Sequence, residues 1–419
     1  MIDFDASVQV AASAAQRLCI SVEALTIDGW PLLLSRTNAT ATMRAPSGVF
    51  FGHGGGGAPD QAGVRAAMEC LERHAQFRRH PAPPEIVAPW DAVHENAISP
   101  LAFGLYDRAQ YATVNFPCTP FTFREPIEWI SVTDLLDGSR RLAPIEFVYP
   151  NAPLGRRPFV RETSSGTAAH VDPTRAALAG LCELVERDAA MLLWHRLPQT
   201  AAIPVNEIPV PELREELSRV RSLGYVVVVA SLEYDLNIPC FLVVALQGDG
   251  FAYGLGCHPD SRQALAHAIV EVGQALASVY MEAASLSINR SFGEVQVPDD
   301  HYRLYHRGPR HHILRQMLAR TLTPAASAAL PAIFRYPPPD ETHTLRVAVQ
   351  ALAAHGFRAY ACDVTPDSVQ DTGVRVVRTL VPGLVPLHFG FDRMRLGCER
   401  LTGAGSPGRL CNLLPHFLR

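Results

Sequence analysis

Residues 172–196 read DPTRAALAGLCELVERDAAMLLWHR. Asp172 can cap a helix and Pro173 suits the first helical position, so this stretch predicts a helix that ends near Arg196. Alanine, leucine and other apolar residues occupy all of its sides. A helix that is apolar on every side is a buried helix.

Three charged residues interrupt this buried helix. Glu183, Glu186 and Arg187 are spaced three and four residues apart, so their side chains project from neighbouring positions on one side. Burying a carboxylate costs several kcal/mol unless a cation or a hydrogen-bond donor compensates it. We therefore expect positive charge to meet these carboxylates.

The same Glu-x-x-Glu-Arg pattern occurs earlier in the chain, as Glu69, Glu72 and Arg73. It lies in a helix that is predicted to begin at Pro59 and to last to about Arg79. If the two helices pack side by side, four carboxylates and two guanidinium groups share one pocket. Magnesium prefers oxygen ligands and guanidinium groups bind phosphate oxygens, so this set suits a nucleotide triphosphate that carries metal ions.

A third predicted helix, opened by Pro259 and Asp260 and ending near Met281, adds Glu271 and Gln274. These two residues are again three apart, on an otherwise apolar run. A single Glu-x-x-Glu-Arg on a helix is a common solvated pattern. Its second occurrence, in a buried helix, favours a functional site.

Composition limits the class of protein. The chain has 419 residues, with 37 Lys+Arg against 41 Asp+Glu and 48% apolar residues, which favours an enzyme-sized globular body and argues against a general nucleic-acid binder. No apolar stretch approaches the roughly 20 residues that a membrane span needs. The nine cysteines are odd in number and form no Cys-x-x-Cys pair, so zinc and disulfide frameworks are not expected. Free thiols and a cytoplasmic location are expected instead.

The remaining pattern alternates hairpins with helices, which predicts an α+β (mixed α/β) fold with antiparallel or mixed sheets packed against long helices. Strands are predicted in two pairs. Asp137-Gly138 joins residues 127–134 to 141–148, and Gly248-Asp249-Gly250 joins residues 240–247 to 251–257. Gly54–Gly57 lacks the Gly-Lys-Ser/Thr ending of a P-loop, so we expect a flexible turn before the first long helix. No heptad and no short repeat is visible.

Two other groups are weaker candidates. Four histidines in an Arg-rich connection lack regular ligand spacing and are expected on a solvated surface: His301, His306, His311 and His312. Ser164 and Ser165 lack the Gly-x-Ser-x-Gly surroundings of a nucleophile. We expect them to make polar contacts at the lip of a pocket.

Several stretches resemble motifs of the YcaO family, and together they cover nearly the whole chain. The central stretch TSSGTAAH, followed by LCELVERD and MLLW, is similar to the family's central motif, and residues 59–74 resemble its first motif. The other matching segments are Ile238-Pro239, Gly254-x-Gly256, residues 264–274, Leu396-Gly397 and residues 412–416.

The resemblance implies a YcaO-like fold around a central ATP cleft. It implies that Glu69, Glu72, Glu183 and Glu186 bind Mg2+ and ATP, with Arg73 and Arg187 near the phosphates. Further nucleotide-binding candidates from the same motifs are Ser164, Ser165, Glu271 and Gln274.

The chemistry that the resemblance implies is activation of a peptide backbone. A Cys, Ser or Thr side chain of a substrate peptide adds to the preceding amide carbonyl, ATP phosphorylates the resulting oxyanion, and phosphate leaves to give an azoline. This reaction needs charge neutralisation and a held geometry more than an enzyme nucleophile, so no catalytic residue is assigned.

The resemblance also implies partners and a domain plan. The substrate would be a ribosomally made precursor peptide, and a ubiquitin-activating-enzyme-like protein would recognise its leader, since no recognition domain precedes the YcaO-like region. Residues 1–50 are expected to form a segment that packs on the core, and residues 51–419 a catalytic domain that includes the C-terminal tail. A homodimer is an open alternative, and neither nucleic acid nor membrane is an expected partner.

Some positions depart from the family pattern. Gly55 stands where relatives carry a lysine, and Arg65 stands where they carry a serine. Ser165 replaces an asparagine, and Leu276 replaces an arginine. The proline-rich carboxyl terminus of relatives is reduced to residues 415–419. Arg65 either replaces the lost lysine charge or pairs with Glu69 at the i, i+4 spacing. Two alternatives therefore stay open, a thioamide- or amidine-forming enzyme and a non-catalytic scaffold.

Overall fold

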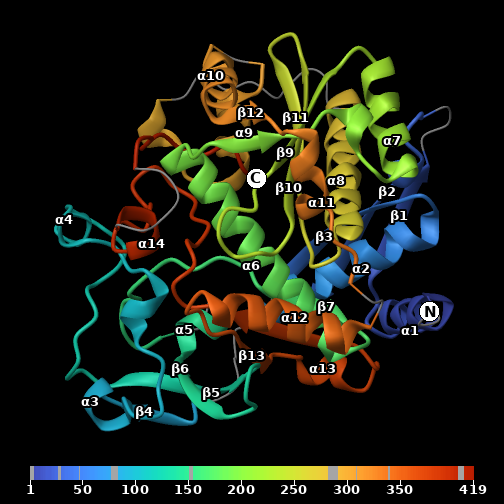
Figure 1. Ribbon diagram of the computed structural model, residues 1–419. Helices are drawn as coiled ribbons and strands as arrows, with labels where there is room; N and C mark the ends of the chain where they lie inside the picture. The colour runs from blue at the N-terminus through green and yellow to red at the C-terminus, as the bar shows by residue number, and fades with distance from the viewer. Residues whose placement is uncertain are drawn as a thin grey trace.

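The computed structural model of the chain describes residues 4–26, 30–46, 48–76, 84–150, 154–281, 291–307, 309–337, 340–403 and 410–419. Within these ranges the strands form three sheets, and a long helix packs on each sheet (Figure 1). The predicted α+β class, with antiparallel and mixed sheets against long helices, is confirmed. None of the helices in the described ranges has both the length and the apolar character needed to cross a bilayer.

The central helix predicted from residues 172–196 is α6 (Pro173–Arg196), which runs through the middle of the molecule in Figure 1. The Asp172 side chain accepts a hydrogen bond from the Thr174 N–H and Pro173 occupies the first turn, as expected for this N-terminus. Most of the helix is buried. It packs on β7 (Thr167–His170), β14 (Arg375–Leu380) and α12 (Glu341–Ala354).

The first sheet has the order β1 (Ser21–Thr26), β2 (Thr37–Ala45) and β3 (Gly48–Gly56), and α2 (Pro59–Gln76) packs on it. The expectation of a flexible turn at Gly54–Gly57 is wrong, because Gly54, Gly55 and Gly56 belong to β3. A Cβ atom on Gly52 would lie 2.0 Å from the Ala66 carbonyl oxygen of α2, and one on Gly54 would lie 2.1 Å from that of Ala62. Glycine is needed here because the helix crosses the strand at backbone contact.

The second sheet has the order β11-β10-β9-β8-β12, and α8 (Ser261–Met281) packs on its β10–β11 hairpin. The hairpin was predicted correctly. The strands are β8 (Thr200–Ala202), β9 (Val226–Ser231), β10 (Cys240–Gln247), β11 (Gly250–Cys257) and β12 (Leu322–Pro324), and helix α7 (Pro211–Ser222), which was not predicted, packs beside α8.

These two sheets contain a structural repeat that was not found in the sequence. The unit β2–β3–α2 recurs as β10–β11–α8 at one offset, which carries Gly52 to Gly254 and Glu69 to Glu271. The close contacts recur with it, because a Cβ atom on Gly254 would lie 2.0 Å from the carbonyl oxygen of Ala268. The first long helix and the third are therefore equivalent elements of two similar units.

The third sheet has the order β4-β5-β13-β14-β7, with β6 paired to β5. The strand predicted at 141–148 is shorter than expected, because β6 (Arg140–Pro144) is followed directly by a helical turn, α5 (Ile145–Val148). The other strands of this sheet are β4 (Ile86–Ala88), β5 (Ile127–Asp134) and β13 (Tyr360–Asp363). The remaining helices of the described chain are α1 (Phe4–Arg17), α3 (Trp90–Val93), α4 (Arg108–Tyr111), α9 (Pro298–Tyr305), α10 (His311–Thr321), α11 (Leu330–Ile333), α13 (Asp367–Gln370) and α14 (Glu399–Thr402).

The expectation of a solvated surface for the four histidines is wrong for three of them. His301, His306 and His311 are buried, whereas His312 is exposed. The ring of His301 stacks on that of His416 at 4.1 Å between centroids, and burial lowers the pKa of His301 to about 4. The local excess of arginine concealed two helices, α9 and α10. His301 and Tyr305 of α9 contact the His416 and Pro415 carbonyls, so α9 holds the C-terminal segment against the core.

We predict that Gly254→Ala destabilises the protein by about 2–3 kcal/mol or more, because the added methyl group overlaps backbone atoms of α8 rather than a movable side chain. The measurement is the free energy of unfolding in urea. Gly155→Ala is the matched control, since a Cβ atom on Gly155 meets no atom within 4 Å. Equal stabilities for the two variants would contradict the backbone contact of α8 with β11.

Candidate functional site

Three helices bring their acidic residues to one region. Glu72 comes from α2, Glu183 from α6 and Glu271 from α8. Burial raises the pKa of Glu72 well above its usual range, and the carboxylates of Glu69 and Glu183 raise it further. Burial and the carboxylates of Glu183 and Glu69 likewise raise the pKa of Glu271. The two predicted Glu-x-x-Glu-Arg helices and the third helix therefore share one charged site, as expected from the sequence.

Helices α2 and α6 meet through β7, on which both of them pack. The side chain of Glu72 reaches from α2 to this strand, where its Oε1 accepts a hydrogen bond from the Ala169 N–H at 2.8 Å. Glu183 of α6 binds just before the same strand, since its Oε2 accepts from the Gly166 N–H at 2.9 Å. A four-residue strand thus positions one carboxylate from each helix.

The repeated units hold their carboxylates in the same way. Glu69 Oε2 accepts a hydrogen bond from the His53 N–H at 2.5 Å, and Glu271 Oε2 accepts from the Leu255 N–H at 2.9 Å. His53 and Leu255 are equivalent residues of β3 and β11, each flanked by two glycines. Hydrogen bonds from N–H groups favour the charged form of a carboxylate, and they fix each side chain by one of its two oxygens.

Two arginines lie beside the other oxygens. Arg73 Nη2 is 2.6 Å from Glu69 Oε1, and Arg187 Nη1 is 2.9 Å from Glu186 Oε1. Arg187 Nη2 also lies 3.6 Å from Glu183 Oε1. Burial alone lowers the pKa of Arg187, but the surrounding carboxylates outweigh it and raise the pKa above its usual value. Arg187 is therefore the main cation of the buried part of the site.

Carboxylate charge still exceeds what these arginines compensate. Burial raises the pKa of Glu186 to about 8; Arg187 offsets part of this shift, and Glu271 and Glu183 add to it. A carboxylic acid with such a pKa retains much of its proton at neutral pH. Clustered carboxylates of raised pKa are typical of sites whose charge is completed by a bound cation.

The donor set was compared with what a metal ion requires. In the described part of the chain, no three His, Cys, Asp or Glu side chains lie close enough together to form a metal cage by themselves. Mg2+ does not need such a cage, because it commonly binds one or two carboxylates and completes its shell with water and substrate phosphates. Carboxylate oxygens flanked by guanidinium groups fit an ion that arrives with a phosphate ligand.

The two predicted serines differ in position. The Ser164 side chain is exposed, and its backbone carbonyl accepts a hydrogen bond from Gln76 Nε2 at 3.2 Å. Ser165 is buried, and its hydroxyl accepts from Thr163 Oγ1 at 3.1 Å. The hydroxyl of Ser165 lines a pocket, as predicted, and its partner is a second hydroxyl rather than the imidazole that a serine nucleophile would use.

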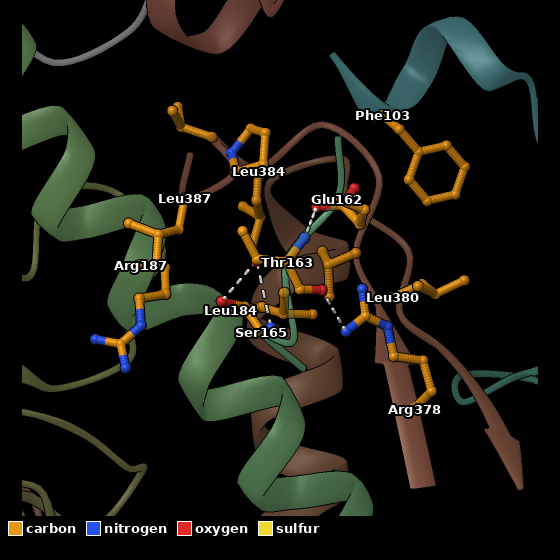
Figure 2. Close-up of a pocket in the computed structure, with 13 residues that line it drawn as sticks. Phe103, Glu162, Thr163, Ser165, Leu184, Arg187, Arg378, Leu380, Leu384 and Leu387 are labelled. Atoms are coloured by element: carbon orange, nitrogen blue, oxygen red, sulfur yellow. Dashed lines mark hydrogen bonds between the residues drawn. The ribbon is translucent and has the colours of Figure 1, made fainter. Parts of the chain in front are cut away.

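Figure 2 shows this pocket, and Arg187, which contacts Glu183 and Glu186, is one of the residues that line it. Arg187 of α6 and Arg378 of β14 contribute to its lining, and in Figure 2 the Arg187 guanidinium points away from the other labelled residues. The other lining residues are mostly apolar: Phe103, Glu162, Thr163, Ser165, Leu184, Leu380, Val381, Leu384, Val385, Pro386 and Leu387. The cavity volume of about 50 Å³ is enough for a few water molecules. Arg187 is therefore shared between the acidic site and an apolar cavity.

Sequence reasoning missed Arg378. Its guanidinium is buried and donates hydrogen bonds to the Phe147 carbonyl at 3.1 Å, the Thr163 carbonyl at 3.2 Å and Thr167 Oγ1 at 3.2 Å. Burial lowers its pKa, because these acceptors are all neutral. An arginine inside the otherwise apolar strand 375–380 was the signal that could have identified it.

The C-terminal segment also approaches the site. The N–H of Arg419 donates a hydrogen bond to the Tyr253 hydroxyl at 2.7 Å, and Phe417 and Leu418 are buried. Burial raises the pKa of Tyr253 to about 12, and Arg187 is near enough to lower it in part. The last residue of the chain thus contacts a tyrosine whose pKa Arg187 affects.

Comparison with known proteins identifies a family. A family model described as YcaO cyclodehydratase, ATP- and Mg2+-binding, matches residues 53–385. A protein of Rhizobium leguminosarum bv. trifolii, named as an uncharacterized protein in the tfuA 3′ region, is 32% identical over 165 residues. This match covers 36% of the chain and 39% of the relative, so it spans about two fifths of that protein.

Solved structures share the fold. A heterocyclase in complex with substrate and cofactor has a TM-score of 0.71 at 21% identity, covering 90% of this chain and 52% of that chain. YcaO from Methanopyrus kandleri, bound with AMPPCP and Mg2+, has a TM-score of 0.62 at 19% identity and covers 93% of both chains. The E. coli microcin synthetase McbBCD complex with pro-MccB17 bound gives 0.57 at 13% identity, covering 88% of both.

We predict that Glu186→Gln changes the pH dependence of stability. Between the ordinary glutamate pKa of 4.5 and the value of about 8, the folded protein keeps a proton that the unfolded chain releases, so the wild type loses stability as pH rises through this range. The variant lacks this loss. Its free energy of unfolding relative to the wild type should therefore increase by on the order of 3 kcal/mol from pH 5 to pH 8.5.

Urea unfolding of the ligand-free protein at several pH values checks this prediction. Glu215→Gln on α7 is the matched control, because Glu215 is 66% exposed. Parallel stability curves for wild type and Glu186→Gln would show that the carboxyl group ionises normally.

Proposed function

The chain belongs to the YcaO family, and we propose that it is an ATP-dependent enzyme that activates a peptide backbone amide and converts Cys, Ser or Thr residues of a ribosomally made peptide to azolines. The observation that carries this proposal is the convergence of Glu72, Glu183 and Glu271, from three separate helices, on one site with two arginines. Such a site suits a nucleotide that carries its metal ions.

We assign the residues that would hold the nucleotide and the metal. Glu69, Glu72, Glu183 and Glu186 are the proposed Mg2+ ligands, and Arg73 and Arg187 are placed near the phosphates. The fit rests on two features of the site, the excess of carboxylates and the guanidinium groups that already contact them. The Methanopyrus kandleri structure, which holds AMPPCP and Mg2+ on the same fold, supports the choice of ATP and Mg2+ as ligands. Glu271, Gln274, Ser164 and Ser165 are proposed to complete the nucleotide site.

In this proposal ATP supplies the phosphoryl group that makes the amide oxygen a good leaving group. The side-chain sulfur or oxygen of the substrate residue bonds to the preceding carbonyl carbon, and the amide oxygen departs with the phosphate. The peptide loses one water in total, and ATP becomes ADP and phosphate. The protein contributes positive charge and orientation, for which Arg187 is suited because only 18% of its side chain is exposed and two carboxylates already hold it.

The proposed substrate is a precursor peptide delivered by a second protein. The E. coli microcin synthetase McbBCD complex, which shares the fold, has pro-MccB17 bound, and this supports the proposal. For this chain, a leader-binding partner resembling ubiquitin-activating enzymes is our proposal, and so are the cytoplasmic location and the homodimer.

We predict that Glu183→Gln and Glu186→Gln each reduce phosphate release at least about tenfold, because each removes a carboxyl group that would bind the metal or fix Arg187. Release is measured with precursor peptide, partner protein and ATP. Glu215→Gln, on the exposed face of α7, is the control and should retain wild-type turnover. Equal turnover in the wild type and both site variants would remove the proposal.

Two further measurements separate the alternatives. The mass of the peptide product distinguishes loss of water, for an azoline or a macrocyclic amidine, from exchange of oxygen for sulfur, for a thioamide. Calorimetry with Mg2+ and AMPPCP tests the non-catalytic scaffold. Tight binding by the wild type argues against a scaffold, and absence of binding favours it.

A further inference from the structure

The small cavity beside α6 is lined by one arginine whose charge no carboxylate balances, Arg378. The other arginine of its lining, Arg187, is paired with two carboxylates of α6, and in Figure 2 its guanidinium points away from the other labelled residues. The carboxylate of the lining, Glu162, lies 3.4 Å from Arg395 Nη2. Among the described residues, Arg378 forms no ion pair, so it supplies the net charge of the cavity.

The guanidinium of Arg378 has one nitrogen without a hydrogen-bond partner in the described ranges. Its Nε donates to the Phe147 carbonyl, and its Nη1 donates to the Thr163 carbonyl and to Thr167 Oγ1. Nη2 keeps its two N–H donors, although the residue is only 2% exposed. A buried charged donor without an acceptor costs free energy, so binding of a group that brings an acceptor to Nη2 is favoured.

The cavity and the acidic site are joined at Gly166. The N–H of Gly166 donates to Glu183 Oε2 at 2.9 Å, and its carbonyl accepts from the Thr379 N–H at 2.7 Å. Ser165 and Arg378, which line the cavity, are the chain neighbours of Gly166 and Thr379. Burial lowers the pKa of Arg378, and nearby carboxylates, Glu183 among them, offset part of this shift. A group in the cavity therefore lies beside the acidic site.

The size of the cavity limits what can enter it. Its volume is about 50 Å³, whereas an engineered protein cavity that accepts benzene measures about 150 Å³. A purine base and an aromatic side chain are therefore too large. A side chain of about two or three heavy atoms fits, and cysteine, serine and threonine have side chains of this size.

The walls of the cavity distinguish among these three side chains. Leu184 and the apolar residues between Leu380 and Leu387 form most of the lining. A hydroxyl group loses more free energy than a thiol when it leaves water for apolar surroundings, because a thiol behaves as a small hydrophobic group. A neighbouring cation also lowers the pKa of a thiol and favours the nucleophilic thiolate, whereas a hydroxyl stays neutral. The apolar wall and the charge of Arg378 therefore both favour cysteine.

We propose that this cavity receives the side chain of the substrate residue that cyclises, that Arg378 Nη2 donates a hydrogen bond to its sulfur, and that the enzyme selects cysteine over serine and threonine. This inference rests on the proposed function and names its substrate residue. The thiol releases its proton to water, and the sulfur keeps the electron pair that forms the bond to the preceding carbonyl carbon. The amide oxygen then leaves with the phosphate, and the amide nitrogen gives up its proton as the C=N bond forms. Arg378 is thus a specificity-determining residue rather than a nucleotide ligand.

The experiment uses three versions of the precursor peptide that differ only in carrying Cys, Ser or Thr at the modified position. Each is incubated with the whole chain, its partner protein and ATP, and kcat/KM is measured from the loss of one water by mass. The wild type should convert the Cys peptide about 10- to 100-fold more efficiently than the Ser or Thr peptide, as expected for a hydrogen bond to a charged group. Arg378→Gln should lower kcat/KM for the Cys peptide by a similar factor and leave that for the Ser peptide within about threefold.

A second variant tests the cavity independently of Arg378. Leu384→Phe fills the cavity and should abolish conversion of all three peptides, but calorimetric binding of AMPPCP with Mg2+ should be unchanged. Leu136→Phe is the matched control, because Leu136 is exposed in the turn between β5 and β6, and it should convert the Cys peptide like the wild type. Thermal unfolding shows whether each variant is folded, and Leu384→Phe decides if Arg378→Gln is not.

The outcomes separate this inference from the proposed function. Equal conversion of the Cys and Ser peptides by the wild type, or wild-type turnover by Leu384→Phe, overturns the cavity assignment while the proposed function stands. A folded Arg378→Gln variant that keeps the full preference for Cys overturns the role of Arg378. Loss of AMPPCP binding in Leu384→Phe also overturns the assignment, since the cavity then belongs to the nucleotide site. If the wild type removes water from none of the three peptides, the proposed function itself fails.

Discussion

Backbone N–H groups hold the acidic side chains of three helices, and the site depends on these contacts. Glu69, Glu72, Glu183 and Glu271 each accept one hydrogen bond from a residue in a strand or directly beside one. Such bonds compensate part of the cost of burying a carboxylate, but they add no opposite charge. The pKa values of Glu72 and Glu271 remain raised despite them. The protein therefore fixes the positions of its acids, and the ion pairs with Arg73 and Arg187 neutralise them only in part, which is a state that a bound cation would relieve.

Glycines make these contacts geometrically feasible. The donor His53 lies between Gly52 and Gly54, and Leu255 lies between Gly254 and Gly256. At each flanking glycine a Cβ atom would overlap the backbone of the packed helix, so the helix can approach the strand only where no side chain intervenes. A glutamate on that helix then reaches the N–H group between the glycines. In α6 the same approach is seen at Gly180, where a Cβ atom would lie 2.5 Å from the Gly166 carbonyl oxygen.

The sequence predicted the acidic site better than it predicted the framework. The spacing of Glu183, Glu186 and Arg187 fixes a common helix face whatever the tertiary structure, so these residues could be identified directly. The role of the glycine run could not be identified from the sequence. Glycine suits a flexible turn, and it is also required in a strand that a helix covers at backbone contact. His301 was placed wrongly for a similar reason, since its burial depends on α9 packing against His416. The repeat escaped notice because few side chains besides the glycines and one glutamate are kept between its units.

The repeat also explains why the charge of the site is uneven. Equivalent positions carry Glu72 and Gln274, Arg65 and His267, and Arg73 and Ala275, so α2 is charged where α8 is neutral. What α8 retains is Glu271, held by its strand and close enough to Arg187 and Glu186 to affect both pKa values. Two units of the same shape thus differ in charge: α2 carries Arg65, Glu69, Glu72 and Arg73, whereas at the equivalent positions of α8 only Glu271 is an acid. The two repeated units share their backbone arrangement but differ in charge, and this combination suits a ligand whose two ends differ in charge.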